Sequence, residues 1–437
     1  MSNSSTEWAY LDSANERVVG AAGWPELPGT GSLSGQAAAP EQHPATEAEP
    51  GPATGSEPGP ASWPRPRPDL PARGRHRRTA VTAAAAALTA AAACALAIPA
   101  SASVAHVRSA VPASWKIIKY VPGGGGPEFS AITATSKSSA WAFEAFPESS
   151  AKPVAWRLSG STWSKVSFPG RTGEQVAAAG SSSAGNVWAI TVAGSRSRAL
   201  RWNGTTWAST GSLRTDADDV TVISRSDVWI FGSPDVPSHP GAWHYNGHTW
   251  SRVASGHGLT SGSALGHRSV WAVGGKSVAH WNGHTWSRTS VASLLPANTT
   301  LSQSSLVGIY ASSSGNVWAV GTGGREDEGG PTVLLHYNGH AWSHVANELS
   351  GNPVQVVPDG SGGLWIPVPS VDGIPFQMLR YSSGHLLPAA LPVSGRRLNV
   401  PAVAAIPRTN ETFGAGFRHR TDNLGRGDVA ALLEYKR

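Results

Sequence analysis

The sequence has one cysteine and few charged residues. The single cysteine, Cys94, lies inside an apolar stretch, so the rest of the chain can form neither a disulfide of its own nor a thiol-based catalytic centre. Charged residues make up only 14% of the 437 positions, and the glycines at 123–126 lack the following Lys-Ser/Thr of a phosphate-binding loop. The 50 glycines and 33 prolines instead favour many short strands joined by turns.

The net charge of +6 does not indicate nucleic-acid binding, because much of it comes from one arginine-rich run at 65–78. Residues 79–105, directly after this run, carry no charge. A basic run followed by an apolar stretch is typical of a membrane-targeting element with its basic side in the cytoplasm. Residues 1–78, rich in Pro, Ala, Gly and Glu, are expected to be a disordered tail.

Two fates are open for the hydrophobic helix predicted at 79–105. Ala100-Ser101-Ala102 fits a signal-peptidase site, so cleavage near Ala102 would give a secreted protein. Residues 79–98 are also just long enough to span a bilayer as a single-pass anchor. We favour the anchor, with the tail inside and residues 106–437 outside the cell membrane, because a discarded signal has no use for so long a preceding tail.

An aromatic pattern recurs seven times in residues 106–437 and is clearest at 269–288. There, two short apolar strands are followed by Asn282-Gly283 and then by Trp286. Asn-Gly is the strongest signal for a two-residue hairpin, because both residues tolerate a positive φ.

The first aromatic of each unit stands at Trp141, Trp188, Trp229, Trp271, Trp318, Trp365 and Phe413. The second stands at Trp156, Trp202, Tyr245, Trp281, Tyr337, Tyr381 and Tyr435. The third stands at Trp163, Trp207, Trp250, Trp286 and Trp342, with Leu386 in the sixth unit.

This repeat predicts an all-β fold, a seven-bladed β-propeller. Four short strands in a period of about 40–50 residues are typical of propeller blades, which stack radially to bury both faces of each sheet. The seventh unit ends before its third aromatic, and Ser114-Trp115-Lys116-Ile117 has the register of the missing strand. We therefore expect Trp115 to lie beside Tyr435, so that the first and last strands close the ring.

The repeat resembles that of kelch-type propellers, which include the central domain of galactose oxidase. Val270-Trp271-Ala272-Val273-Gly274-Gly275 resembles the kelch apolar run and double glycine, and His280-Trp281-Asn282-Gly283-His284-Thr285-Trp286 resembles the kelch aromatic, turn and tryptophan. The resemblance implies a propeller repeat protein, which the basic run and apolar stretch at 65–105 lead us to expect outside the cytoplasm. It also raises copper chemistry, but the cross-linked Cys–Tyr cofactor of galactose oxidase has no counterpart here, since the one cysteine is Cys94. We expect no cofactor.

The candidate site lies on irregular loops. If the strands of each unit are named a to d from the centre outwards, the b–c and d–a connections share one face and the regular Asn-Gly turns lie on the other. Functional residues concentrate on irregular loops over a rigid scaffold. The candidate ligand-binding residues are Asp235, His239, Trp243, Arg325, Glu326, Asp327, Arg418, His419, Arg420 and Asp422. Trp243 is out of register with the repeat and is expected in a long loop, where it could stack on a sugar.

Metal binding and catalysis have weaker support. Histidines recur in three units, as the pairs His244 and His248, His280 and His284, and His336 and His340. Pairs in different units are too far apart to share one ion, and a single pair offers two ligands where zinc needs three or four. The a strands are mostly Ala, Val, Thr and Ser, with Asp218 and Asp219 as candidates for the carboxylate pair of a glycosidase.

We therefore expect an extracytoplasmic binding module for a protein, a glycan or cell-wall material, with no nucleic-acid partner and a monomeric state. Two alternatives remain open. One is a glycan-active hydrolase or lyase with a degenerate site in the channel, and the other is a single-pass receptor whose cytoplasmic tail binds a partner.

Overall fold

The computed structural model describes residues 114–121, 127–146, 151–234, 241–255, 258–296, 304–324, 330–346, 349–370, 374–393, 397–419 and 428–436. Residues 1–113 lie outside this set, so the expected tail, hydrophobic helix and cleavage site remain predictions. Within the described residues, no helix combines the length and the apolar character needed to cross a bilayer.

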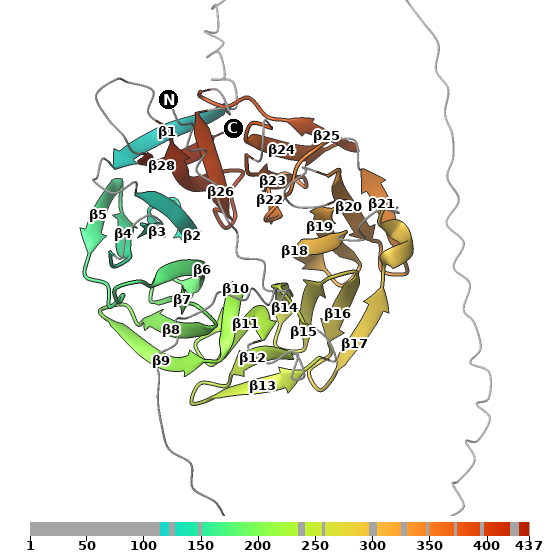
Figure 1. Cartoon of the computed structure of the whole chain (residues 1–437), viewed down its shortest axis with the longest axis horizontal. Coiled ribbons are helices and arrows are strands. Elements are labelled where there is room, and N and C mark those ends of the chain that lie inside the picture. Colours follow the sequence, from blue (N-terminus) through green and yellow to red (C-terminus); the bar gives the residue numbers. More distant parts are fainter. Residues whose placement is uncertain are drawn as a thin grey trace, which may run out of the picture. The chain divides into compact units, whose positions relative to one another are not determined.

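Seven four-stranded antiparallel sheets stand side by side around a central axis, as the repeat predicts (Figure 1). Blade 1 contains β2 (Glu128–Ser136), β3 (Ser139–Ala145), β4 (Val154–Ser159) and β5 (Thr162–Val166). Blade 2 contains β6 (Gln175–Ser183), β7 (Asn186–Ala193), β8 (Arg196–Trp202) and β9 (Trp207–Leu213). Blade 3 contains β10 (Thr215–Ser224), β11 (Asp227–Pro234), β12 (Gly241–Tyr245) and β13 (Trp250–Ala254). Blade 4 contains β14 (Ser261–Gly266), β15 (Ser269–Gly274), β16 (Ser277–Trp281) and β17 (Trp286–Ser290).

The second half of the ring repeats this order and ends with the predicted closure. A 3₁₀ turn, η1 (Ala292–Leu294), follows blade 4. Blade 5 contains β18 (Ser305–Ser313), β19 (Asn316–Thr322), β20 (Thr332–Tyr337) and β21 (Trp342–Ala346). Blade 6 contains β22 (Val357–Pro358), β23 (Leu364–Val368), β24 (Gln377–Ser382) and β25 (His385–Pro388). Blade 7 contains β26 (Leu398–Ala405), β27 (Thr412–Arg418), β28 (Val429–Lys436) and, as its outer strand, β1 (Ser114–Val121).

The closure has the register expected from the sequence. Trp115 pairs with Tyr435 across the β1–β28 ladder, and their ring centroids are 5.6 Å apart. Trp115 is 2% exposed and also contacts Trp365 of blade 6 at 5.2 Å. The N-terminal strand therefore completes the junction between blades 6 and 7 and covers the edge of β28 that would otherwise be open.

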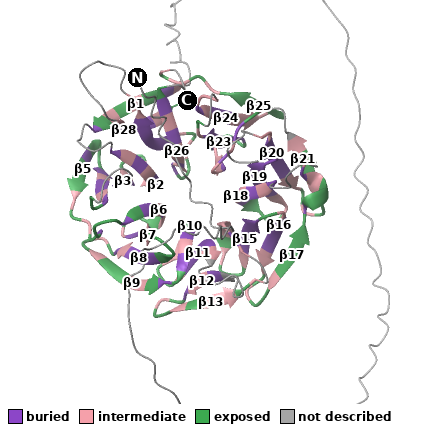
Figure 2. Ribbon diagram, viewed as in Figure 1, coloured by how far each residue is buried: buried purple, intermediate pink, exposed green. Residues whose placement is uncertain are grey.

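The core lies between blades, where each b-strand aromatic contacts the aromatics of the next blade. The Trp141 ring centroid is 5.0 Å from that of Trp202 and 5.1 Å from that of Trp207. The same contact recurs for Trp188 with Tyr245 and Trp250, Trp229 with Trp281 and Trp286, Trp271 with Tyr337 and Trp342, Trp318 with Tyr381, and Trp365 with Tyr435. Buried residues are accordingly concentrated on the second and third strands of the blades, and exposed ones on the outer strands (Figure 2).

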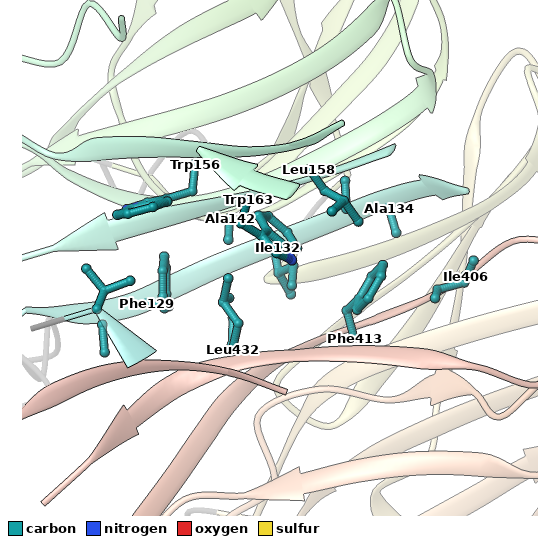
Figure 3. Close-up of a cluster of buried hydrophobic side chains, with 14 residues drawn as sticks. Phe129, Ile132, Ala134, Ala142, Trp156, Leu158, Trp163, Ile406, Phe413 and Leu432 are labelled. Carbon is teal, nitrogen blue, oxygen red and sulfur yellow. The ribbon is translucent and has the colours of Figure 1, made fainter. Parts of the chain in front are cut away.

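The junction between the last and first blades follows the same plan. Phe413 of blade 7 lies 6.0 Å from Trp163 of blade 1, and Phe129 lies 6.4 Å from Trp156. Leu432 and Ile406 from blade 7 belong to the same buried cluster (Figure 3). The ring is thus closed by side-chain contacts as well as by the shared sheet.

The Asn-Gly turns differ from the two-residue hairpins expected from the sequence. Trp202 pairs with Trp207, so the loop holds four residues, and the Asn203 Oδ1 accepts the backbone N–H groups of Thr205 and Thr206. Only the glycine takes a positive φ, +108° at Gly204. The asparagine is selected by its side-chain acceptor rather than by its own tolerance of a positive φ. The two-residue form occurs instead in blades 1 and 6, at 160–161 and 383–384.

We expect Trp115→Ala to lower the free energy of unfolding by about 3–5 kcal/mol, because a large buried side chain at the closure is removed. Ile118→Ala, on the same strand but 40% exposed, should cost less than about 0.5 kcal/mol. Urea unfolding of the two variants measures the difference. Equal losses would show that the closure does not depend on the Trp115 contacts.

Candidate binding face

The connections between strands fall on two faces, as the sequence predicts. Three isolated backbone bridges connect these segments: Gly232 near the end of β11 with Leu259 before β14, Gly275 after β15 with Leu306 in β18, and Pro331 before β20 with Ser350 after β21. We call the face that holds the b–c and d–a connections the loop face. On the opposite face, the turn face, Lys137 and Glu411 form an ion pair between the a–b turns of blades 1 and 7.

Three of the ten candidate residues lie within the described part of the loop face or beside it. These are Trp243, Arg418 and His419. The other seven, which are Asp235, His239, Arg325, Glu326, Asp327, Arg420 and Asp422, lie outside the described residues and remain predictions.

Trp243 lies in a strand and not, as expected, in a long loop. It occupies the middle of β12, where it pairs with Ile230 and Arg252. Because Trp243 stands two residues before Tyr245, the two side chains point to the same side of the strand. Trp243 packs against the buried cluster between blades 2 and 3. The Arg252 guanidinium lies 5.1 Å from its ring centroid. These contacts with other residues of the propeller reduce the area of the Trp243 indole that could stack on a sugar.

Arg418 and His419 lie at the end of β27, where the last and first strands of the chain meet. Arg418 Nη1 donates a hydrogen bond of 3.0 Å to the Tyr120 hydroxyl of β1, whose ring is 40% exposed. His419 Nδ1 lies 2.8 Å from Asp428, and this hydrogen bond raises the pKa of His419 although burial acts in the opposite direction. Tyr120 is 298 positions away from Arg418, which is why no sequence pattern connects the two residues.

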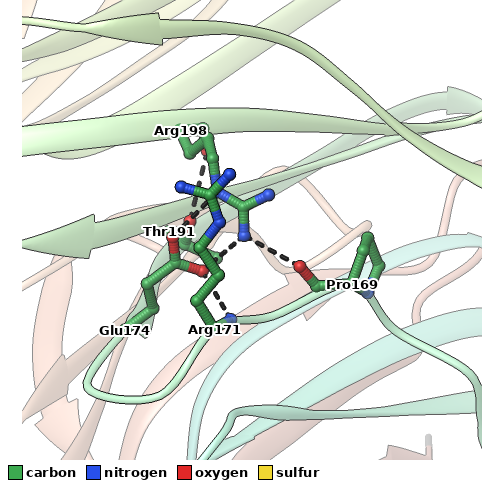
Figure 4. A network of polar contacts seen from close by, with 5 residues as sticks. All are labelled: Pro169, Arg171, Glu174, Thr191 and Arg198. Carbon is green, nitrogen blue, oxygen red and sulfur yellow. Dashed lines mark hydrogen bonds and ion pairs between the residues drawn. The ribbon is translucent and has the colours of Figure 1, made fainter.

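A buried ion pair fixes the d–a connection that enters blade 2 (Figure 4). Arg198 Nε donates to Glu174 Oε1 at 2.8 Å, and Arg198 Nη2 donates to the Pro169 carbonyl at 2.8 Å. The backbone N–H of Arg171 donates to Glu174 Oε2 at 2.9 Å. Burial acts to raise the pKa of Glu174, but the hydrogen bonds and charge of Arg198 together with the Arg171 amide lower it overall. The segment 169–174 is therefore held firmly against β8.

Exposed cations gather on the described connections of the loop face. Lys152, Arg171, Arg214 and Arg397 are exposed, whereas the carboxylates of these connections, Glu174 and Asp428, are already paired. Arg196, the first residue of β8, is also exposed. Because the next residue, Ser197, pairs with Leu213 of the antiparallel strand β9, Arg196 lies opposite Arg214 in the register. The Arg214 carbonyl accepts a hydrogen bond from Arg252 Nη2 at 3.3 Å. The described connections of blades 2 and 3 therefore carry exposed cations, with the partly exposed Asp216 in the adjoining strand β10.

The carboxylate of Asp219, on the inner strand β10, links two blades. Asp219 Oδ2 accepts hydrogen bonds of 2.9 Å from the Ser261 hydroxyl and from the Gly262 N–H of β14, and Oδ1 accepts one of 2.7 Å from the Val220 N–H. Burial raises the pKa of Asp219, although all three hydrogen bonds oppose this shift. Both of its oxygens are thus engaged in joining the inner strands of blades 3 and 4.

The repeated histidines of the c strands stack on the b-strand tryptophans. The rings of His244, His280 and His336 lie 4.1–4.3 Å from those of Trp229, Trp271 and Trp318. Each Nε2 bonds the residue that opens the preceding b strand, and these partners are Asp227, Ser269 and Asn316. Burial lowers the pKa of His280 and of His336, which favours the neutral ring. Across the described residues, no group of three or more His, Cys, Asp or Glu side chains is placed to hold a metal ion.

Comparison with solved structures supports the fold. A catalytically inactive virginiamycin B lyase from Staphylococcus aureus, in complex with quinupristin, superposes with a TM-score of 0.50 at 11% identity, over 73% of this chain and 99% of that one. The structure of U3-55K superposes with a TM-score of 0.50 at 9% identity, over 74% of this chain and 98% of that one. At these identities the likeness shows the fold alone, a seven-bladed β-propeller. No protein-family model matches the sequence, and no curated protein does.

We expect Arg198→Met to lower the free energy of unfolding by about 3–5 kcal/mol, because it leaves the buried Glu174 carboxylate without its partner. The double variant Arg198→Met, Glu174→Leu should recover most of this loss, since no charge then remains buried. Urea unfolding of the two variants at neutral pH measures both effects. A double variant as unstable as the single one would contradict this explanation.

The same pair predicts a dependence on pH. Since the folded state lowers the pKa of Glu174, its ion pair stabilises the protein above the ordinary value of about 4.5 and loses this effect as the pH falls through the lowered pKa. The stability difference between the wild type and Glu174→Gln should therefore be largest near neutrality and shrink under acidic conditions. A difference that stays constant from neutral to acidic pH would contradict this assignment.

Proposed function

We propose that this propeller is an extracytoplasmic binding module, tethered or secreted, whose loop face binds an acidic partner, either a protein or a glycan of the cell envelope. The observation that carries the proposal is the set of exposed cations on the described loop face, Lys152, Arg171, Arg196, Arg214 and Arg397. Exposed charges of one sign over a rigid scaffold attract a partner of the opposite sign and orient it on approach.

The arrangement of the carboxylates favours binding over catalysis. A glycosidase needs two carboxyl groups free to act on either side of the bond that is cleaved. Of the two candidates on the inner strand β10, Asp219 is held by three hydrogen bonds and serves to connect blades 3 and 4. Catalysis in the channel would require this carboxylate to be released from its contacts.

Export is part of the proposal and rests on the sequence alone. The arginine-rich run at 65–78, followed by the uncharged stretch at 79–105, would place the propeller outside the cytoplasm. The kelch-like pattern at 270–286 is consistent with a repeat that carries loops of different length on a rigid scaffold.

Charge reversal on the loop face tests the binding function. The full-length protein is incubated with cell-envelope fractions and with an array that includes acidic glycans, at low and at high salt. Arg171→Glu with Arg214→Glu should weaken binding roughly tenfold and reduce its salt dependence, as expected for two rim charges. Arg225→Glu with Arg268→Glu, two exposed arginines of the turn face, is the matched control and should bind normally. Equal losses in both double variants, or no binding to any fraction, would refute the proposal.

Protease accessibility tests the location. Protease added to intact cells should degrade the propeller. If residues 79–105 remain uncleaved, a protected fragment of about the length of the tail plus the anchor should be left. A propeller that is protected until the cells are lysed would refute an extracytoplasmic location.

A further inference from the structure

A groove of about 390 Å³ opens on the outer rim between blades 4 and 5. One wall is formed by the end of β17 and by η1, and the other by the β20–β21 hairpin, elements that lie side by side at the edge of the ring (Figure 1). The volume is at the lower end of the range for small-molecule sites, about 300–1,000 Å³.

The groove arises from a local departure from the repeat. At other junctions, the preceding blade covers the c- and d-strand aromatics of the next one. Phe168 lies 5.2 Å from Trp207, and Thr210 accepts a hydrogen bond of 3.1 Å from Trp250 Nε1. After blade 4, the Val291 N–H donates to the Lys276 carbonyl, and the chain then forms η1 at the edge of the ring. Trp342 borders the groove and is partly buried, as are Trp207, Trp250 and Trp286 at the equivalent positions of other blades.

The groove has an aromatic floor and mixed walls. Tyr337 and Trp342 lie 5.4 Å apart, and the Tyr337 hydroxyl donates to the Gly339 carbonyl, which fixes the ring in place. The rest of the lining is mixed, with His340, Thr289, Ser290 and Ser293 as its polar residues and Val291, Leu294 and Ala341 as its apolar ones. No Asp, Glu, Lys or Arg is among the residues that line it.

We infer that this groove is a binding site for a neutral pyranose sugar. A pyranose presents an apolar face of C–H groups, which an aromatic floor can cover, and a rim of hydroxyls, which imidazole and hydroxyl side chains can hydrogen-bond. The uncharged lining favours a neutral sugar over an acidic one, because a carboxylate or sulfate would lose its hydration without a cation to pair with. The groove includes η1, part of the d–a connection between blades 4 and 5, but none of the exposed cations Lys152, Arg171, Arg196, Arg214 and Arg397 lines it.

Ligand-observed NMR with the full-length protein tests the inference. The probes are the methyl α-glycosides of glucose, galactose, mannose and fucose, together with N-acetylglucosamine, at millimolar concentration. We expect saturation transfer to the ring protons of at least one of these sugars. Ser293→Trp, which fills the groove, should abolish the signal, whereas Ala292→Trp, in the same 3₁₀ turn but outside the lining, should retain it.

A second pair of variants probes the hydrogen-bonding wall without adding bulk. His340→Ala should weaken binding by about three- to tenfold, the loss of one hydrogen bond. His284→Ala removes the equivalent histidine of blade 4, outside the groove, and should have no effect. No saturation transfer to any of the five sugars, or equal transfer in Ser293→Trp and the wild type, would overturn the inference. Loss of sugar binding with normal binding to acidic envelope fractions would separate this site from the loop face.

Discussion

The ring depends on one contact, repeated at each junction, between the b-strand aromatic of one blade and the aromatics of the next. Trp141 against Trp202 and Trp207 is the clearest case, and several of these pairs meet edge to face. Among the described residues, nine tryptophan indole N–H groups are buried without a hydrogen-bond acceptor. Such a loss normally destabilises a fold, but an indole edge directed at the electron-rich face of a neighbouring ring recovers part of it.

A closed ring makes this contact cooperative. Each blade buries its two faces only if both neighbours are present, so a single open junction would expose aromatic surface on two blades. Closure is secured by backbone pairing at one place, where β1, which precedes blade 1 in the chain, pairs with β28 of blade 7. Because this constraint acts at each junction, the residues that satisfy it recur from blade to blade. Side chains such as His280 and Arg380 cover the faces of the tryptophan rings.

The sequence predicted the ring because its stability depends on large aromatic residues in fixed registers, and these are visible without an alignment. The same reasoning failed where a local contact decides the outcome. The Asn203 side chain converts the expected two-residue turn into a four-residue loop, and strand pairing places Trp243 inside a blade. The ion pair of Glu174 with Arg198 joins a loop to a strand 24 positions away, and neither residue belongs to the repeat. Pairs of this kind carry no periodic signal.

Repetition also indicates where specific chemistry can arise. A side chain found at the same place in several blades, such as the stacked histidines, must satisfy the same packing in each, which leaves it little freedom for a ligand. A departure from the repeat is under no such constraint. The η1 turn forms one side of a groove beside Trp342, and the exposed arginines of blades 2 and 3 stand on connections of unequal length. In a scaffold whose regular positions are all used to hold neighbouring blades together, selective binding has to come from the positions where one blade differs from the rest.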